Sequence, residues 1–232
     1  INYYASPTWS GTVCSQGSPC TVSQGVKTMG TGGNTLFLTD GIYTGDTGMV
    51  VVSGKVCTAV ARCYIKALND GAVTVDGQYA RTPLDLVNSA YVNIEGINFK
   101  RSGGSSPDVC KIRGSNGTSF VAHVEIKRVI CYDVGVLDAN RHVVSIHNIE
   151  DVLLEDVAGF GQGRKVLAQY QSRRITWRRC FGMWNKYGSD TQPKSSLDLL
   201  YNSEDVLWEN CIGEWDELVA ANNRYGNAAP GP

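Results

Sequence analysis

A nine-residue pattern of apolar and polar positions occurs five times along the chain. The copies begin at Tyr91, His123, Asp151, Arg174 and Asp205, and their starts lie 32, 28, 23 and 31 residues apart. Positions two and four are apolar in every copy, which is the period-two alternation of a strand with one buried face. Position seven is apolar again after a two-residue break. Each copy therefore predicts two short strands joined by a bend.

Such a repeat points to a solenoid, because one unit alone cannot bury its apolar face. Stacking brings equivalent residues onto neighbouring strands roughly 4.8 Å apart. The uneven spacing predicts loops of different length at one turn of each coil. The V-x-I pattern and the Gly- and Ser-rich flanks disfavour a helical repeat. The predicted fold is all-β, a single-stranded parallel β-helix of about six or seven coils.

The outward fifth position carries charges whose sign alternates from copy to copy: Glu95, Lys127, Glu155, Arg178 and Glu209. Opposite charges on neighbouring strands stabilise a sheet. The arginine-rich fourth copy would suggest a site for nucleic acid or for an acidic substrate if it stood alone. In the stack, we expect Arg178 to lie between Glu155 and Glu209, and Arg179 beside Asp156. The stretch is therefore predicted to be structural.

A further set of strands precedes three of the copies. It places His147, Tyr170 and Tyr201 at equivalent positions, so we expect the two tyrosines to stack and His147 to continue their column as a structural residue. His142 and His147 are five residues apart, which predicts opposite faces of a continuous strand. The three histidines of the chain do not have the spacing of a metal site.

Residues 21–30 predict a short helix that caps the front of the solenoid. Thr21 and Gln24 have the spacing of a capping box, and Gly30 can end the helix. The apolar face of this helix is formed by Val22, Val26 and Met29.

Composition limits the classes of partner. The 232 residues include 21 Lys and Arg against 22 Asp and Glu, and the net charge is -1. General binders of nucleic acid or of membrane surfaces need an excess of positive charge, so both are disfavoured. No apolar run approaches the roughly 18 residues of a membrane span. We expect one domain, with an N-terminal segment and cap at 1–35, coils at 36–216 and a C-terminal tail at 217–232.

Two pairs of cysteines bracket short loops, Cys14 with Cys20 and Cys57 with Cys63. Their spacing is unlike that of zinc or thioredoxin motifs, and an even count of eight cysteines favours disulfides in an oxidising compartment. A chain that begins at Ile1, without methionine, fits a processed and exported protein. Eight buried thiols in a cytosolic protein are the alternative.

Two further cysteines and one asparagine are candidates for covalent modification. Cys180 and Cys211 stand in register at position seven, which permits either a disulfide or two stacked free thiols. Asn116 begins an N-glycosylation sequon, which matters only in a host that glycosylates.

The front of the chain resembles a known family. "YYASPTWSG", a cysteine loop and "GGNTLFLTDGIYTG" are similar to the opening of secreted right-handed parallel β-helix proteins of the pectate-lyase-like superfamily. With the repeats, the resemblance covers nearly the whole chain and implies a right-handed β-helix. It implies little about activity, because this fold hosts many functions. The sequence also lacks the W-I-D-H, R-x-P-x-x-R, G-H-G and R-I-K signatures of pectate lyases and polygalacturonases.

One segment resembles the active region of alginate and chondroitin lyases. In "NCIGEWDELVAANN", Glu214 and Asp216 fall where the family has two calcium-binding acids, and Ala221 replaces the lysine that serves as base. Without that base, proton abstraction beside a uronate carboxylate has no obvious agent. The resemblance implies Ca²⁺ at these two acids, and no other cofactor is predicted.

Two other groups of residues could bind a glycan or an anion. Arg164 and Lys165 follow the glycines of "GFGQG" in a predicted turn and could present two cations. Trp184 and Trp215 occupy matching positions just after their copies, where they form either an exposed aromatic pair that stacks on sugar rings or a pair buried under loops.

Two functions from different classes follow. The first is an extracellular structural subunit that assembles head to tail into filaments or rings, through residues 1–12 and an uncapped final coil at 205–232. The second is a secreted carbohydrate-binding or polysaccharide-degrading protein. The sequence favours assembly over an enzyme, and any enzymatic activity would resemble that of a polysaccharide lyase. Both functions place the protein outside the cell or at its surface.

Overall fold

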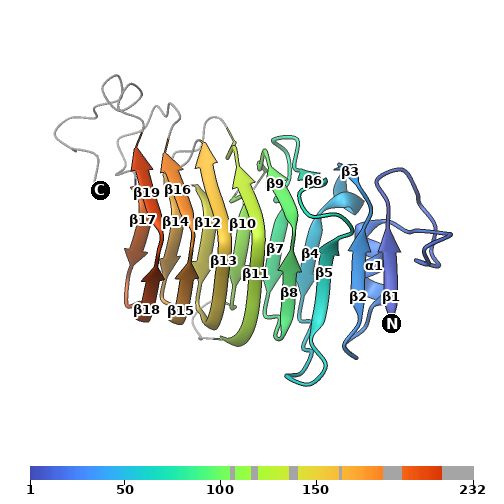
Figure 1. The fold of residues 1–232 in the computed structure, drawn as a ribbon, viewed down its shortest axis with the longest axis horizontal. Helices are drawn as coiled ribbons and strands as arrows, with labels where there is room; N and C mark the ends of the chain where they lie inside the picture. Colours follow the sequence, from blue (N-terminus) through green and yellow to red (C-terminus); the bar gives the residue numbers. More distant parts are fainter. Residues whose placement is uncertain (105–107, 116–119, 136–140, 162–163, 185–194, 216–232) are drawn as a thin grey trace.

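The computed structural model describes residues 1–104, 108–115, 120–135, 141–161, 164–184 and 195–215. In this part of the chain, parallel strands stack in three columns along one axis (Figure 1). The fold is the predicted right-handed parallel β-helix. Within the described ranges, no helix is long and apolar enough to cross a membrane.

The first two columns are joined because two long strands run through both. The first contains β1 (Asn2–Ala5), β2 (Thr35–Leu38), β5 (Cys63–Ala67), β8 (Val92–Glu95), the starts of β11 (Phe120–Tyr132) and β13 (Ile149–Gly161), β15 (Arg173–Arg178) and β18 (Glu204–Glu209). The second contains β3 (Gly41–Tyr43), β6 (Val73–Asp76), β9 (Ile97–Lys100), the ends of β11 and β13, β16 (Phe181–Trp184) and β19 (Ile212–Trp215).

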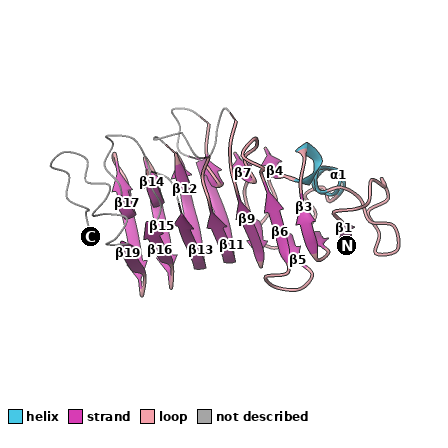
Figure 2. Ribbon diagram, turned by 90° about the horizontal axis from the view of Figure 1, so that it is seen from above, coloured by secondary structure: helices cyan, strands magenta, loops and turns pink. Residues whose placement is uncertain are grey.

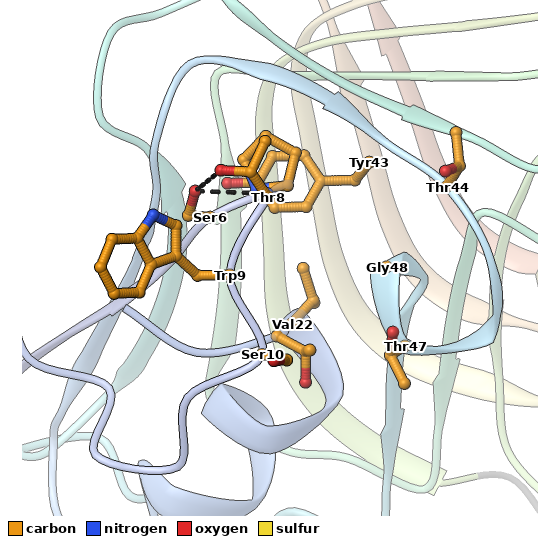
Figure 3. Close-up of a pocket in the computed structure, with 11 residues that line it drawn as sticks. Ser6, Thr8, Trp9, Ser10, Val22, Tyr43, Thr44, Thr47 and Gly48 are labelled. Carbon is orange, nitrogen blue, oxygen red and sulfur yellow. Dashed lines mark hydrogen bonds between the residues drawn. The ribbon is translucent and has the colours of Figure 1, made fainter. Parts of the chain in front are cut away.

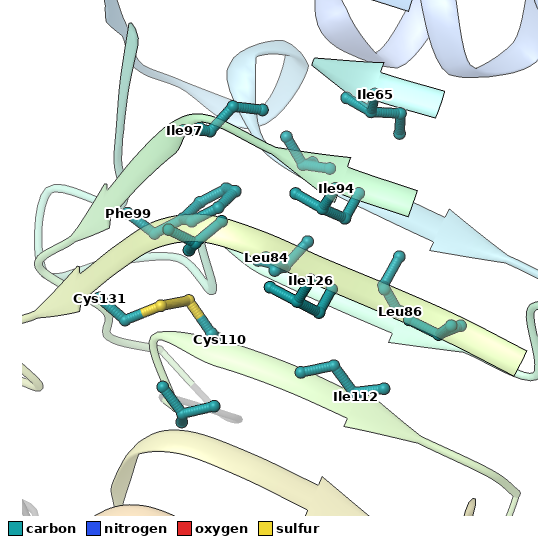
Figure 4. Packing of buried hydrophobic residues seen from close by; sticks show 14 of the residues in the cluster. Ile65, Leu84, Leu86, Ile94, Ile97, Phe99, Cys110, Ile112, Ile126 and Cys131 are labelled. Atoms are coloured by element: carbon teal, nitrogen blue, oxygen red, sulfur yellow. A yellow bond between two sulfur atoms is a disulfide. The ribbon is translucent and has the colours of Figure 1, made fainter. Parts of the chain in front are cut away.

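The third column is a separate sheet. It contains β4 (Val50–Ser53), β7 (Leu84–Val87), β10 (Cys110–Arg113), β12 (His142–His147), β14 (Lys165–Tyr170) and β17 (Ser195–Leu200). Figure 2 shows β17, β14, β12, β7 and β4 in one layer and β19, β16, β13 and β9 in another. Apolar side chains fill the space between the columns (Figure 4).

The repeat predicts the interior of the first column correctly. Ile94, Ile126, Leu154 and Trp177, the fourth positions of successive copies, lie in register and are almost completely buried. The rings of Trp177 and Trp208 stack with their centroids 4.8 Å apart. A period-two pattern is sufficient here because each of these strands has one face on the core.

The two-residue break is a backbone bend. Its second residue has a left-handed conformation in every copy, with φ between 50° and 73°, at Gly96, Arg128, Asp156, Arg179 and Asn210. The bend turns the chain from the first column into the second, which explains why apolar residues resume at position seven.

The inward side chains of the second column become smaller toward the back of the solenoid, where they are replaced by glycine. Its inward residues in register are Tyr43, Val75, Phe99, Cys131, Gly159, Gly182 and Gly213. A Cβ atom on Gly159 would lie 2.8 Å from the Leu167 side chain and 2.9 Å from that of Val166. The glycine therefore leaves room for two consecutive residues of β14 to turn inward.

The front of the solenoid is capped as predicted. Helix α1 (Val22–Thr28) begins after Thr21, whose hydroxyl accepts a hydrogen bond from the Gln24 backbone N–H at 3.3 Å. Val22, the first residue of the helix, and Met29, which follows its last residue, are fully buried. The Gln24 side chain bonds Thr28 at 3.0 Å.

The N-terminal strand β1 is hydrogen-bonded on both sides to other segments of the same chain. Strand β1 pairs in register with β2 on one side. On the other side, Tyr4 N–H donates to the Cys14 carbonyl at 2.8 Å and Cys20 N–H donates to the Tyr4 carbonyl at 3.0 Å. Both edges of the strand that was predicted to reach a neighbouring copy are therefore occupied within the chain.

Three disulfides cross-link the described residues. The structure forms both predicted bonds, Cys14–Cys20 and Cys57–Cys63, and adds Cys110–Cys131, which the spacing did not predict. The third bond joins β10 to β11 across the interior of one coil (Figure 4). Of the two arrangements left open for Cys180 and Cys211, the structure has free thiols.

The arginine-rich stretch is a charge-paired coil, as predicted. Arg178 lies 3.5 Å from Glu155 on one side and 2.6 Å from Glu209 on the other. Arg179 pairs with Asp156 at 2.7 Å. Each arginine therefore neutralises carboxylates of neighbouring coils.

The front of the same column is paired differently. Glu95 is bonded by Lys66 at 2.9 Å and by Arg128 at 3.1 Å, while Lys127 lies 2.7 Å from Glu125 and 3.7 Å from Glu155. The ion pairs at the front of the column thus join charged residues at neighbouring positions of the repeat as well as residues at the fifth position.

Candidate functional site

Seven polar side chains gather outside the apolar core of the third column, on β12, β14, β17 and the residues just before β10. We call them the third-column cluster: Asp108, His142, Ser145, His147, Lys165, Tyr170 and Asp198. His142, Lys165, Ser145 and Asp108 are at most 7% exposed. Buried titratable groups of this kind are uncommon outside functional sites and ion-pair networks.

Strand register brings these residues together. His142 pairs with Lys165, His147 pairs with Tyr170, and Ser145 stands two strands from Asp198 in one row. Residues 143 and 144 of β12 are both buried, as are residues 166 and 167 of β14. Because two successive apolar residues turn inward at the start of each strand, the preceding His142 and Lys165 lie outside the core.

The inward turn of β12 and the register of β14 with β17 correct two predictions. Both histidines of β12, His142 and His147, contact the ring of Tyr170 edge-on and so share one face, because the interruption at Val143 breaks the expected alternation. Tyr201 does not continue the column, since Leu200 is the partner of Tyr170 in the register. Tyr201 has a φ of 39° and is 70% exposed.

Two carboxylates organise the cluster. Asp108 accepts a 2.8 Å hydrogen bond from the His142 backbone N–H and a 2.6 Å bond from the Ser145 hydroxyl. Asp198 lies 2.7 Å from the Lys165 ammonium. The carboxylates thus fix the start of β12 and neutralise the buried lysine.

Some polar atoms of this region have no partner. Among the described residues, no donor or acceptor forms a hydrogen bond with His142 Nδ1, His147 Nε2 or the Ser195 hydroxyl. A buried polar atom without a hydrogen bond costs free energy, on the order of 1–3 kcal/mol each. These enclosed atoms lack the hydrogen bonds that buried polar groups normally form, which marks the cluster as a candidate site.

Burial also determines the protonation of the cluster. It lowers the pKa of His142, against a smaller opposing effect of the Asp108 carboxylate, and lowers the pKa of His147 to about 4. Burial raises the pKa of Tyr170 above its ordinary value. At neutral pH both imidazoles are therefore neutral and can accept hydrogen bonds, and the phenol keeps its proton; the same shifts make the imidazoles weak bases and the phenol a weak acid.

The predicted cation pair is placed differently from the expectation. Lys165 lies inside β14 rather than in the turn, and it is 5% exposed and paired with Asp198. Arg164 precedes that strand, and its charge contributes to the low pKa of His142. Lys165 is therefore a buried member of the third-column cluster, and Arg164 adjoins it in the chain.

The predicted tryptophan pair is in register but is not an exposed platform. Trp184 pairs with Trp215 between β16 and β19. Trp184 is 1% exposed, because its side chain points into the apolar core. The side chain of Trp215 lies outside the described part of the structure.

The predicted calcium and glycosylation positions lie at or beyond the described ranges. Glu214 is exposed on β19, and its carbonyl accepts a hydrogen bond from Ser196 at 2.5 Å. Asp216 and Asn116 lie outside the described residues. Within those residues, no group of three or more His, Cys, Asp or Glu side chains could hold a metal ion.

A shallow hollow of about 260 Å³ lies over the first column, on β11, β13 and β15. Its charged side chains belong to ion pairs: Arg62 lies 3.0 Å from Glu125, and Asp151 lies 2.5 Å from Arg174 and 3.6 Å from His123. This face is thus part of the structural charge network, and the third-column cluster is the stronger candidate site.

Comparison with known proteins establishes the fold. No family model and no curated protein sequence matches the chain. Its structure is similar to that of pectate lyase Pel9A, with 12% identity and a TM-score of 0.55 over 79% of this chain and 54% of the lyase. A candidate glycosyl hydrolase from Parabacteroides merdae matches with 14% identity and a TM-score of 0.53, over 82% of this chain and 86% of that protein. The chain thus has the pectate-lyase-like β-helix fold and spans about half the length of the pectate lyase.

Proposed function

We propose that the chain is a secreted carbohydrate-active protein that binds a polysaccharide over the third-column cluster. The observation that carries the proposal is the buried, unpartnered Nδ1 atom of the neutral His142, surrounded by Asp108, Lys165 and Tyr170. Sugar hydroxyls donate and accept hydrogen bonds, and one could supply the missing partner once the side chains that enclose this atom move aside. The disulfides support export, because such bonds persist in oxidising compartments.

The same atoms could support proton transfer. His142 Nδ1 would accept a proton from the substrate and the Tyr170 phenol would donate one to a departing oxygen, each only if the bound substrate moves the pKa of that group back toward neutral pH, because burial weakens the imidazole as a base and the phenol as an acid. General acid–base catalysis by one positioned side chain contributes roughly 10²–10⁴-fold in rate. The fold neighbours favour this direction, since one is a pectate lyase and another a candidate glycosyl hydrolase.

Assembly into filaments or rings stays a prediction, and it is less well supported than the carbohydrate function. It relied on an N-terminal segment free to add a strand to another copy, and that segment is paired on both sides within its own coil. The carbohydrate function therefore takes first place.

A polysaccharide panel tests the proposal. The protein is incubated with pectin, alginate and neutral glucans and xylans, and cleavage is followed by new reducing ends and by the ultraviolet absorbance of unsaturated sugars. We expect one polysaccharide to be bound or cleaved, and His142→Asn to lower that activity at least 100-fold. His123→Asn, a matched change on the first column, should leave it unchanged. Absence of binding and cleavage across the panel, or equal effects of the two substitutions, would refute the proposal.

A further inference from the structure

A pocket of about 220 Å³ lies at the opposite end of the solenoid from the third-column cluster. It is enclosed by the loop at residues 6–10, the start of α1 and the connection between β3 and β4 (Figure 3). We call it the front pocket. Pockets for drug-sized ligands measure roughly 300–1,000 Å³, so this one suits a smaller ligand or one unit of a chain.

Hydroxyl groups dominate the lining of the front pocket. All eleven lining residues are uncharged. Six of them carry an aliphatic hydroxyl: Ser6, Thr8, Ser10, Thr21, Thr44 and Thr47. Each hydroxyl has one donor and two acceptor sites. The pocket therefore offers many hydrogen bonds and no charge.

Half of these hydroxyls are available. The Thr21 hydroxyl caps α1, and those of Ser6 and Thr8 lie 3.3 Å apart. Ser10, Thr44 and Thr47 are exposed, and their hydroxyls have no hydrogen-bond partner within the described ranges. These three can bond a ligand without breaking an internal contact.

The remaining surface of the pocket is apolar and aromatic. Trp9 is 52% exposed and lies on the side of the pocket opposite Thr47 (Figure 3). Val22 and Tyr43 are buried, and the Tyr43 hydroxyl lies 2.8 Å from both the Ala5 and the Thr39 carbonyl oxygens, between which it shares its one proton. Tyr43 therefore contributes a rigid wall, and Trp9 contributes an exposed ring.

We propose that the front pocket binds one neutral sugar unit. A sugar ring has an apolar face of C–H groups that can lie on Trp9, and a rim of hydroxyls that can bond the three free side chains. A uronate or a phosphate would meet no cationic partner, and a purely apolar ligand would leave the hydroxyls without bonds. The proposal goes beyond the proposed function, because it uses a separate set of residues at the other end of the protein.

Titration with sugars tests the front pocket directly. Wild-type protein is titrated with neutral oligosaccharides built from glucose, mannose, galactose or xylose, and with oligogalacturonate, by isothermal titration calorimetry. We expect one neutral series to bind, and Trp9→Ala to weaken it at least tenfold. Thr47→Val, which removes one hydroxyl at constant shape, should weaken it severalfold, and the matched exposed change Thr58→Val should have no effect.

The outcomes separate this proposal from the proposed function. If His142→Asn abolishes polysaccharide activity while neutral-sugar binding persists, the two sites are independent, as proposed. The front-pocket proposal is overturned if no neutral series binds, if oligogalacturonate binds in a Trp9-dependent manner, or if Trp9→Ala and Thr47→Val bind like the wild type. Far-ultraviolet circular dichroism of each variant shows that the β-helix is intact.

Discussion

The Cys110–Cys131 disulfide should contribute more to the free energy of unfolding than either of the other two disulfides. It closes a sequence separation of 21 residues, against 6 for Cys57–Cys63. In the chain-entropy description, a cross-link restricts the unfolded chain more as the loop lengthens. The relation predicts about 3 kcal/mol for the longer loop and about 2 kcal/mol for the shorter one.

Replacing each pair with alanine isolates this difference. All four half-cystines are at most 1% exposed, so both double variants lose two buried sulfur atoms and a similar amount of packing. We therefore expect Cys110→Ala/Cys131→Ala to be less stable than Cys57→Ala/Cys63→Ala by about 1 kcal/mol. For a chain of this length, the longer loop's contribution corresponds to a fall in Tm of roughly 6–12 °C.

Urea unfolding at 25 °C, followed by circular dichroism, measures the two free energies. Counting free thiols in the unfolded wild type confirms that the bonds are present. If the variant without Cys57–Cys63 is equally unstable or less stable, loop length does not govern these cross-links, and local packing around each disulfide does.

Three further predictions address charge, protonation and close packing. Arg178→Glu should lower Tm, because it places a third acid between Glu155 and Glu209, whereas Arg178→Lys should retain most of the wild-type value. The pKa of His147 is about 4 in the folded protein and roughly 6.5 when unfolded, so its contribution to stability is complete above pH 6.5 and lost as the pH falls toward 4; His147→Gln should flatten the stability profile over that range, and an unchanged profile would contradict the assignment. Gly159→Ala should lower the free energy of unfolding in urea by about 1–3 kcal/mol, since its Cβ would collide with two side chains of β14. An unchanged free energy of unfolding would show that the interior can accommodate the extra methyl group.

Much of the architecture follows from short-range pattern. The apolar second and fourth positions, such as Val152 and Leu154, predict their own burial because each strand has one face on the core. The Arg178 contacts follow from register, since a residue's neighbours in a stack occupy the same position of adjacent copies. Thr21 marks the start of α1 because its side chain bonds only three residues ahead.

The third-column cluster could not be predicted in the same way. Asp108 and Asp198 lie outside the nine-residue pattern, and connections of varying length separate them from the copies. Strict alternation places His142 and His147 on opposite faces, and it fails where two successive valines, Val143 and Val144, turn inward.

The third disulfide does not follow from the sequence pattern for a related reason. Cys131 stands at position nine, where later copies have glycine, and its partner Cys110 belongs to the third column. Pairing by proximity along the chain finds bonds within loops. A bond across a coil depends on which side chains face each other through the interior.

The narrowing of the second column makes the coils non-interchangeable. Its inward residue is the ring of Phe99 in one coil, the half-cystine Cys131 in the next, and glycine from Gly159 onward. A coil duplicated next to itself would have an inward residue of the same size as its neighbour. A front coil moved near the back would place a large aromatic ring where side chains of β14 already fill the interior. Growth of this protein by tandem duplication is therefore constrained by position, and a recombinant solenoid designed from its parts must keep their order.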